Sequence, residues 1–206
     1  MQSDSRPIGR KRNPIIEEAR RRQIIDAAIE TVAAVGYAQA SLSRIAEHAQ
    51  ISKSVISYHF AGKDDLLEQV VTQIYDDMWA FIQARLETET TAAGMLSAYI
   101  RSNLGYLRSH RSRLLAVVDV VGNHRAPDGT PRFATTTDES VVTLLSEILR
   151  QGRHDGEFRH FDPQVVAVTV GQALIGAAGQ WAADPTVDLA AYATELITLF
   201  DLATRK

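Results

Sequence analysis

The residues best suited to do chemistry lie close together between positions 41 and 63. Lys53, Ser54 and Val55 stand at the start of one short segment. A lysine donates to guanine, a serine hydroxyl bonds several bases, and a valine contacts a thymine methyl group. The chemistry that this set favours is the reading of DNA base edges, with no covalent bond made or broken.

Further polar and aromatic residues surround these three. Ser57, Tyr58 and His59 are expected on or near the outward surface, and Tyr58 and His59 are candidates for backbone or base contact. Hydroxyl and cationic side chains commonly fix a protein on the phosphate backbone. The candidates for that role are Tyr37, Ser41, Ser43, Arg44, Ser52 and Lys63.

Two short helices must position these side chains. Ser41 and Ser52 are suited to cap the two helix starts, and residues 50–51 form the break between them. The inner sides are predicted from apolar residues at helical spacing: Ile45, Ala46, Ala49, Ile56 and Phe60. This arrangement is the helix-turn-helix pattern, in which the second helix enters the major groove.

Longer helices are predicted on both sides of the pair. Asn13 and Pro14 form a good helix start, and Gly36 forms a natural stop. A second long helix begins near Lys63 and continues to about Glu87, so a lysine and free backbone N–H groups share a site suited to a phosphate oxygen. Residues 1–12 are interpreted as a flexible basic arm, or as a leader without function.

Charge is distributed unevenly along the 206 residues, although the net charge is only −3. Residues 1–63 hold 10 lysines and arginines against 6 acidic residues, and residues 64–206 hold 12 against 19. The basic excess therefore lies with the helix-turn-helix, as DNA binding requires. The chain has no cysteine and, by our interpretation, no uncharged apolar run of 18 residues. We expect a cytoplasmic protein with no membrane contact.

The sequence from Arg20 to Leu67 resembles the DNA-binding domain of the tetracycline-repressor (TetR) family of bacterial transcriptional regulators. The matching residues are Arg22, Ile25, Ala28, Gly36-Tyr37, Ser41, Ile45-Ala46, Ala49, Ile51-Ser52-Lys53, His59-Phe60, Lys63 and Leu66-Leu67. Two positions depart from the family pattern. Gln50 stands where a turn glycine is usual, and Ser57 stands where a tyrosine is usual, so the usual phosphate contact falls to Tyr58 or Ser57.

The resemblance implies an all-α fold of about nine helices in two parts. Residues 13–65 form the DNA-binding domain, and residues 66–206 form a larger ligand-binding and dimerisation domain. The last two helices, of which residues 163–183 are apolar almost all round, are expected to form a four-helix interface in a homodimer. A buried helix pair in a monomer is the alternative. Residues 156–159 (GEFR), Asp162-Pro163 and Trp181 resemble the C-terminal domain of the BetI-like branch.

The resemblance also implies a small-molecule effector bound among the middle helices. Residues that would line its site are Met78, Trp79, Ile82, Tyr99, Asn103, Tyr106, Val117, Val121, Phe133 and Leu145. Their composition suggests an apolar or amphipathic ligand. The expected protein is a dimeric repressor released from a palindromic operator by that ligand. The alternatives are that each residue is ordinary core, and that the chain regulates, or activates, without any effector.

Catalytic and metal-binding functions have less support in the sequence. The chain has no G-x-S-x-G, P-loop, dinucleotide-binding or H-E-x-x-H motif, so we expect neither an enzyme nor a cofactor. His154 and His160 are six residues apart, His110 and His124 are further apart, and none forms a helical i, i+4 pair. We therefore expect surface histidines and no metal site.

Overall fold

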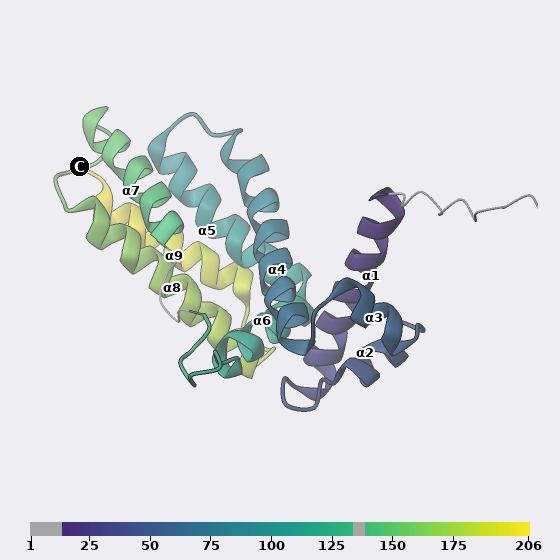
Figure 1. Cartoon of the computed structure of the whole chain (residues 1–206). Coiled ribbons are helices and arrows are strands. Elements are labelled where there is room, and N and C mark those ends of the chain that lie inside the picture. The colour runs from purple at the N-terminus through teal and green to yellow at the C-terminus, as the bar shows by residue number, and fades with distance from the viewer. Residues whose placement is uncertain (1–13, 134–138) are drawn as a thin grey trace, which may run out of the picture.

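The computed structural model describes residues 14–133 and 139–206, and these residues fold into α-helices (Figure 1). In chain order they are α1 (Pro14–Val35), α2 (Leu42–His48), α3 (Lys53–His59), α4 (Lys63–Leu86), α5 (Ala92–Ser109), α6 (Arg111–Asn123), α7 (Glu139–His154), α8 (Pro163–Ala183) and α9 (Leu189–Thr204). This confirms the all-α prediction. The predicted arm at residues 1–12 and the Asn13 cap lie outside the described residues.

The first three helices form a small bundle at one end of the molecule (Figure 1). Ile24 and Ala28 of α1, Ile45 of α2 and Ile56 of α3 are fully buried, which accounts for their spacing in the sequence. Helices α2 and α3 have only seven residues each, too few for a helix that is stable alone. Packing against the rest of the bundle must therefore stabilise them. The bundle confirms the predicted helix-turn-helix.

Local contacts at the two short helices match one predicted cap and correct the other. The Ser41 hydroxyl accepts from the backbone N–H of Arg44 at 3.3 Å. Ser52 occupies the cap position of α3 but makes no capping bond, because its hydroxyl pairs with that of Ser54 at 2.8 Å. Gln50 has φ 55°, a left-handed conformation in which a glycine would be less strained.

Helix α4 connects the small bundle to the rest of the chain. It packs against α1 and also against α5 and α6. The expected domain boundary between residues 65 and 66 therefore falls inside one continuous helix. A rigid connection of this kind transmits movement between its two ends, whereas a flexible linker would not.

The remaining helices pack around α5, which contacts α4, α7, α8 and α9. Residues 124–132 form a loop after α6, and Arg125 and Pro131 form an isolated bridge within it. Phe133 lies outside any helix and packs near the His124 ring.

Helix α8 corrects the expectation that the chain has no uncharged apolar run of 18 residues. It contains 21 residues without a charged side chain, and it is the one described helix long and apolar enough to cross a membrane. Length and composition alone are weak grounds, because a core helix of a globular protein passes the same test. Only 33% of its apolar window is buried in this chain, so much of the helix lies open.

Candidate DNA-reading surface and domain junction

The two sides of α3 differ sharply in exposure. Ile56 is fully buried, and Phe60, which follows the helix, is 3% exposed. Lys53, Ser54, Ser57 and Tyr58 are exposed on the other side. The predicted reading residues therefore share one accessible surface, which is called the α3 face below and comprises Lys53, Ser54, Ser57 and Tyr58.

Two other predicted readers are only partly accessible. Val55 is half-buried and lines a hollow of about 320 Å³ with Ile16 of α1 and Ile51. His59 is half-buried, and its ring meets the Tyr58 ring edge-on at 4.9 Å. Both stand at the border between the α3 face and α1, so their reach toward a ligand is shorter than that of Lys53.

Helix α1 fixes the position of α3 through contacts that the sequence did not reveal. The Arg21 guanidinium donates to the His59 carbonyl oxygen at 2.6 Å and lies 4.5 Å from the centre of the Phe60 ring. The Gln23 amide donates to the Ala49 carbonyl oxygen at 3.2 Å. Arg21 is therefore engaged inside the bundle. A run of three arginines had no sequence signal that would identify the inward-facing member.

The predicted phosphate contacts on α2 form a separate exposed group. Ser41, Ser43 and Arg44 are all exposed. The Arg44 guanidinium donates to the Gln39 side-chain oxygen at 3.0 Å, which leaves further donors on the same group. Together with the exposed Ser52, these residues flank the α3 face.

Tyr37 and Lys63 lie together where the small bundle meets α6. The Lys63 ammonium donates to the Tyr37 carbonyl oxygen at 2.7 Å and lies 4.6 Å from the centre of its ring. Burial lowers the pKa of Lys63, although the Asp64 and Asp119 carboxylates act in the opposite direction. Burial and then Asp64 raise the pKa of the Tyr37 hydroxyl. Both residues are half-buried, so they belong as much to the domain junction as to the outer surface.

The Tyr37 side of this junction continues into α6 and the loop after it. The Tyr37 backbone N–H donates to the Asp119 carboxylate at 2.5 Å, and its hydroxyl lies 3.0 Å from Nδ1 of His124. His124 is only 2% exposed, which corrects the expectation of surface histidines. Its Nε2 lies 3.6 Å from the carboxylate of Glu68 on α4.

Glu68 is held from its other side by Arg132. Two guanidinium nitrogens of Arg132 donate to the Glu68 carboxylate at 2.7 and 2.9 Å. This bond lowers the pKa of Glu68 more than burial raises it. We name the set Tyr37, Glu68, Asp119, His124 and Arg132 the tyrosine junction. It joins the small bundle, α4, α6 and the loop after α6.

A second ionic cluster joins the same helices at the other end of α6. Asp77 of α4 accepts from Arg22 of α1 at 2.8 Å and from Arg113 of α6 at 2.6 Å. Arg113 also lies 3.3 Å from the Asp26 carboxylate of α1. We name these four residues the aspartate junction. The two arginine partners of Asp77 are distant from it in the chain.

The predicted effector-binding residues are largely packed inside the larger domain. Five are buried (Ile82, Tyr99, Tyr106, Val117, Leu145), four are half-buried (Met78, Asn103, Val121, Phe133), and Trp79 is exposed. None of the ten lines the hollow beside Val55 or a second hollow, of about 660 Å³, between α7 and α8. Burial raises the pKa of the Tyr99 hydroxyl to about 12, even though Asn103 bonds to it.

Tyr106 is the unusual member of this group. Its side chain is 3% exposed, its ring stacks on His110 at 4.2 Å, and its hydroxyl has no hydrogen-bond partner within bonding distance. Burial raises the pKa of its hydroxyl, while the Arg113 guanidinium acts in the opposite direction. A buried hydroxyl without a partner costs about 1–3 kcal/mol.

Over the described ranges, no three or more His, Asp or Glu side chains are placed to hold a metal ion.

Comparison with known proteins identifies a family match near the N-terminal end of the chain. Residues 24–70 match the family described as bacterial regulatory proteins, tetR family. The HTH-type transcriptional regulator BetI 1 of Chromohalobacter salexigens is 46% identical over 63 residues, which is 31% of each chain. The chain thus spans about a third of the length of that curated relative.

Two further comparisons extend beyond the small bundle. The regulator BetI of Cronobacter sakazakii is 30% identical over 138 residues, which cover 66% of this chain and 68% of that one. The crystal structure of AibR in complex with isovaleryl coenzyme A and operator DNA superposes with a TM-score of 0.69, covering 87% of this chain and 97% of that one at 20% identity. Identity this low shows a shared fold alone. The match to the family's DNA-binding region and the long similarity to BetI place this chain in the tetR family of bacterial regulatory proteins.

Proposed function

We propose that the chain is a cytoplasmic, homodimeric repressor that reads a palindromic operator and is released from it by a small apolar or amphipathic ligand. The observation that carries the proposal is the α3 face, where polar and cationic groups stand exposed opposite the fully buried Ile56. A short helix with one buried side and one polar side can enter a major groove as a rigid unit. We assign DNA binding to residues 13–65 and the regulatory and dimerisation role to residues 66–206.

Base edges and phosphates are contacted by different parts of this surface in the proposal. Lys53 and Ser54 read base edges, and Val55 approaches a thymine methyl from the border of the face. Tyr58, or Ser57 with a shorter reach, contacts a phosphate. Ser41, Ser43, Arg44 and Ser52 position the neighbouring phosphates, since all four are exposed around α3. AibR, which shares the fold, is a protein solved on operator DNA.

Dimerisation through α8 and α9 is supported by apolar side chains left open on both helices. Val165 and Ile175 of α8 are 62% and 44% exposed, and Leu199 and Leu202 of α9 are 55% and 54% exposed. Exposed apolar surface gathered on two neighbouring helices favours an interface. A symmetric dimer would place the two α3 helices roughly 34–36 Å apart, one turn of DNA.

Two glycines on α8 give this dimer a specific test. A Cβ atom added at Gly176 or Gly179 would meet nothing within 4 Å in the single chain. Gly179→Leu is therefore expected to leave the monomer folded, while it fills the space that a partner helix needs. Sedimentation should show a dimer for the wild type and a monomer for Gly179→Leu and Ile175→Glu. An unchanged dimer in both variants would place the interface elsewhere.

An effector site among the middle helices is supported by the unpaired Tyr106 hydroxyl, which a ligand oxygen could satisfy. Ligand binding would shift the chain between two arrangements of the small bundle. The two junctions lie at opposite ends of α6, so a small displacement of α6 would act on both Asp77 and Tyr37. AibR was solved with isovaleryl coenzyme A, a ligand with a short apolar acyl group.

Regulation without an effector is the second candidate. The packed state of Ile82, Tyr99 and Leu145 favours it, since these predicted lining residues are buried among their neighbours. Selection of bound sequences from random DNA tests the DNA-reading proposal, and enrichment of one palindrome is the expected result. A screen for small molecules that release the enriched DNA then separates the two candidates. Failure to enrich any palindrome would contradict the proposal that the chain is a sequence-specific repressor.

A further inference from the structure

The corner between α7 and α8 is built by the GEFR segment that stood out in the sequence. Gly156 has φ 78°, a conformation that favours glycine, and it turns the chain back after α7. The Glu157 carboxylate accepts from the backbone N–H groups of Ala92 and Ala93 at 3.1 Å each, at the start of α5. The Arg159 backbone N–H donates to the Thr204 carbonyl oxygen at 2.9 Å, at the end of α9. The segment thus fixes one corner against three helix ends.

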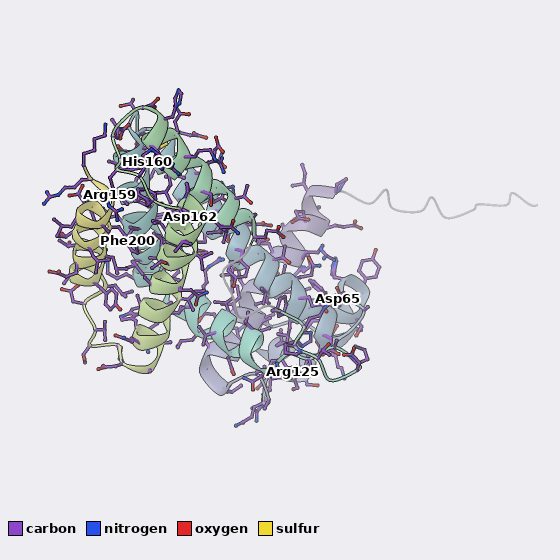
Figure 2. The ribbon with its side chains drawn as sticks, turned by 90° about the vertical axis from the view of Figure 1, so that its left-hand side faces the viewer. Asp65, Arg125, Arg159, His160, Asp162 and Phe200 are labelled. Carbon is purple, nitrogen blue, oxygen red and sulfur yellow. The ribbon has the colours of Figure 1, made fainter. Side chains whose placement is uncertain are left out.

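A hollow of about 660 Å³ lies in this corner. It is lined on the α7 side by Ser146, Arg150, Arg153 and His154, and beyond the turn by residues 160–164. Figure 2 shows His160 and Asp162 at the end of the molecule opposite Asp65 and Arg125, which mark the small bundle and the tyrosine-junction loop. The hollow is therefore remote from the α3 face, and no proposed effector-lining residue borders it.

Two residues that line this hollow carry a buried donor without a hydrogen-bond partner. Ser146 is only 7% exposed, and its hydroxyl makes no hydrogen bond. Nε of Arg153 is also buried and unpaired. Leaving such a group unsatisfied costs about 1–3 kcal/mol, more where it is charged. Ser146 and Arg153 are seven residues apart on α7, about two helical turns, so both lie on the same side of the helix. Two unsatisfied donors on this side indicate a missing acceptor.

The Arg153 guanidinium is oriented by its other contacts. Its Nη2 lies 2.9 Å from Nδ1 of His160, and its centre lies 6.0 Å from the middle of the Phe161 ring. A guanidinium only donates, so Nδ1 of His160 must accept, and the neutral ring then carries its proton on Nε2. This leaves a second donor on His160. The side chains that shape the hollow are thus rich in donors.

The acidic residues near the hollow are already engaged. Asp162 accepts from the backbone N–H groups of Gln164 and Val165 and so caps α8. Arg150 pairs with Glu147 on the exposed side of α7. The cationic Arg153 is therefore the group left without an acidic partner in the hollow, which favours an anion that accepts several hydrogen bonds.

We propose that this corner is a binding site for a phosphoryl group, held by Ser146 Oγ, Arg153 Nε and the ring N–H of His160. A phosphate oxygen accepts several hydrogen bonds, and arginine recognises phosphate through its planar donors. The hollow lies within the usual range of roughly 300–1,000 Å³ for small-molecule sites, so it has room for an organic group attached to the phosphate. The ligand is free phosphate or, as the room indicates, a small phosphate monoester.

Calorimetric titration of the full chain with inorganic phosphate and with glycerol 3-phosphate tests this site. Chloride at equal ionic strength serves as the blank. Saturable binding is expected for both probes, and tighter binding of the ester would identify the organic phosphate as the better ligand. Equal affinity would identify free phosphate. No saturable binding of either probe would overturn the proposal.

Three variants connect binding to the named donors. Ser146→Ala should weaken binding about tenfold and Arg153→Gln about a hundredfold, as expected for hydrogen bonds to a charged group. Arg101→Gln, which changes an exposed arginine of α5 outside the hollow, should bind as the wild type does. Equal binding by all three variants would overturn the assignment.

Stability and DNA binding provide independent readouts. Because Ser146→Ala removes an unsatisfied hydroxyl, its melting temperature without phosphate should equal or exceed that of the wild type. The same variant should lose the rise in melting temperature that phosphate produces. Without phosphate, Ser146→Ala should bind the selected DNA as the wild type does. Phosphate titration therefore tests the phosphate site, and DNA binding tests the α3 face separately.

Discussion

The α3 face and the interior of the larger domain present their candidate residues in opposite ways. Four of the residues proposed to meet DNA stand exposed on α3, opposite the buried Ile56. Five of the ten residues proposed to meet an effector are buried against other side chains. A reading surface needs side chains that protrude, and helical spacing predicts which ones protrude. A pocket requires a space that no side chain fills, and residue types alone do not show where such a space lies.

Truncation of a buried effector-site residue should have the largest effect on stability. Ile82 is 2% exposed on α4, so Ile82→Ala should lower the free energy of unfolding by about 3 kcal/mol. Trp79→Ala, at a side chain 40% exposed on the same helix, should cost less. Urea unfolding measures both. An unchanged stability for Ile82→Ala would mean that the interior around α4 is not filled, and would favour an existing pocket.

Removal of Lys63 should weaken DNA binding about tenfold for every sequence and reduce the slope of log affinity against log salt by about 1. The reason is the loss of one cation at the start of α4, whose ammonium also holds Tyr37. Anisotropy titrations at several salt concentrations measure this. Arg108→Ala, an exposed change at the end of α5, is the control. An unchanged slope would mean that Lys63 does not contact a phosphate and serves only to hold Tyr37.

Replacement of Tyr106 by phenylalanine should leave the protein as stable or raise its stability by about 1 kcal/mol, because the hydroxyl is buried without a partner. Tyr99→Phe is the matched comparison, since the Tyr99 hydroxyl bonds to Asn103 and its loss should destabilise the fold. Thermal unfolding of both variants separates the two environments. A loss for Tyr106→Phe as large as that for Tyr99→Phe would show that its hydroxyl is satisfied.

The smallest expected effect is a dependence of stability on pH at the tyrosine junction. Arg132 lowers the pKa of Glu68 in the folded chain, so this contact stabilises the fold above the ordinary glutamate pKa and is lost as pH falls through the lower folded value. The stability difference between wild type and Arg132→Gln should therefore be present at pH 7, begin to fall near the ordinary glutamate pKa of about 4.3, and disappear only below the lower folded pKa. A difference that persists in acid would assign the effect of Arg132 to packing.

Much of the fold was predictable because it follows from local patterns. Ser41 caps α2 as expected, Gln50 adopts the left-handed turn, and Asp162 caps α8. The spacing of Ile45, Ile56 and Phe60 predicted which sides are buried.

Contacts between distant residues were not predictable. Asp77 meets Arg22 and Arg113 across 55 and 36 positions of sequence, and His124 is buried because α6 places it beside Tyr37. No spacing rule links such residues, because their meeting depends on how whole helices pack. The unpaired hydroxyls of Ser146 and Tyr106 were hidden for the same reason.

The most direct test of the central claim is selection from random DNA, carried out in parallel with the wild type and with Lys53→Ala. Lys53 is exposed on the α3 face and is proposed to contact a base edge. The wild type should enrich a palindrome, and Lys53→Ala should relax the base preference at one symmetry-related pair of positions while keeping the rest. An identical palindrome and equal affinity for both proteins, or no palindrome for the wild type, would contradict the assignment of α3 as the reader.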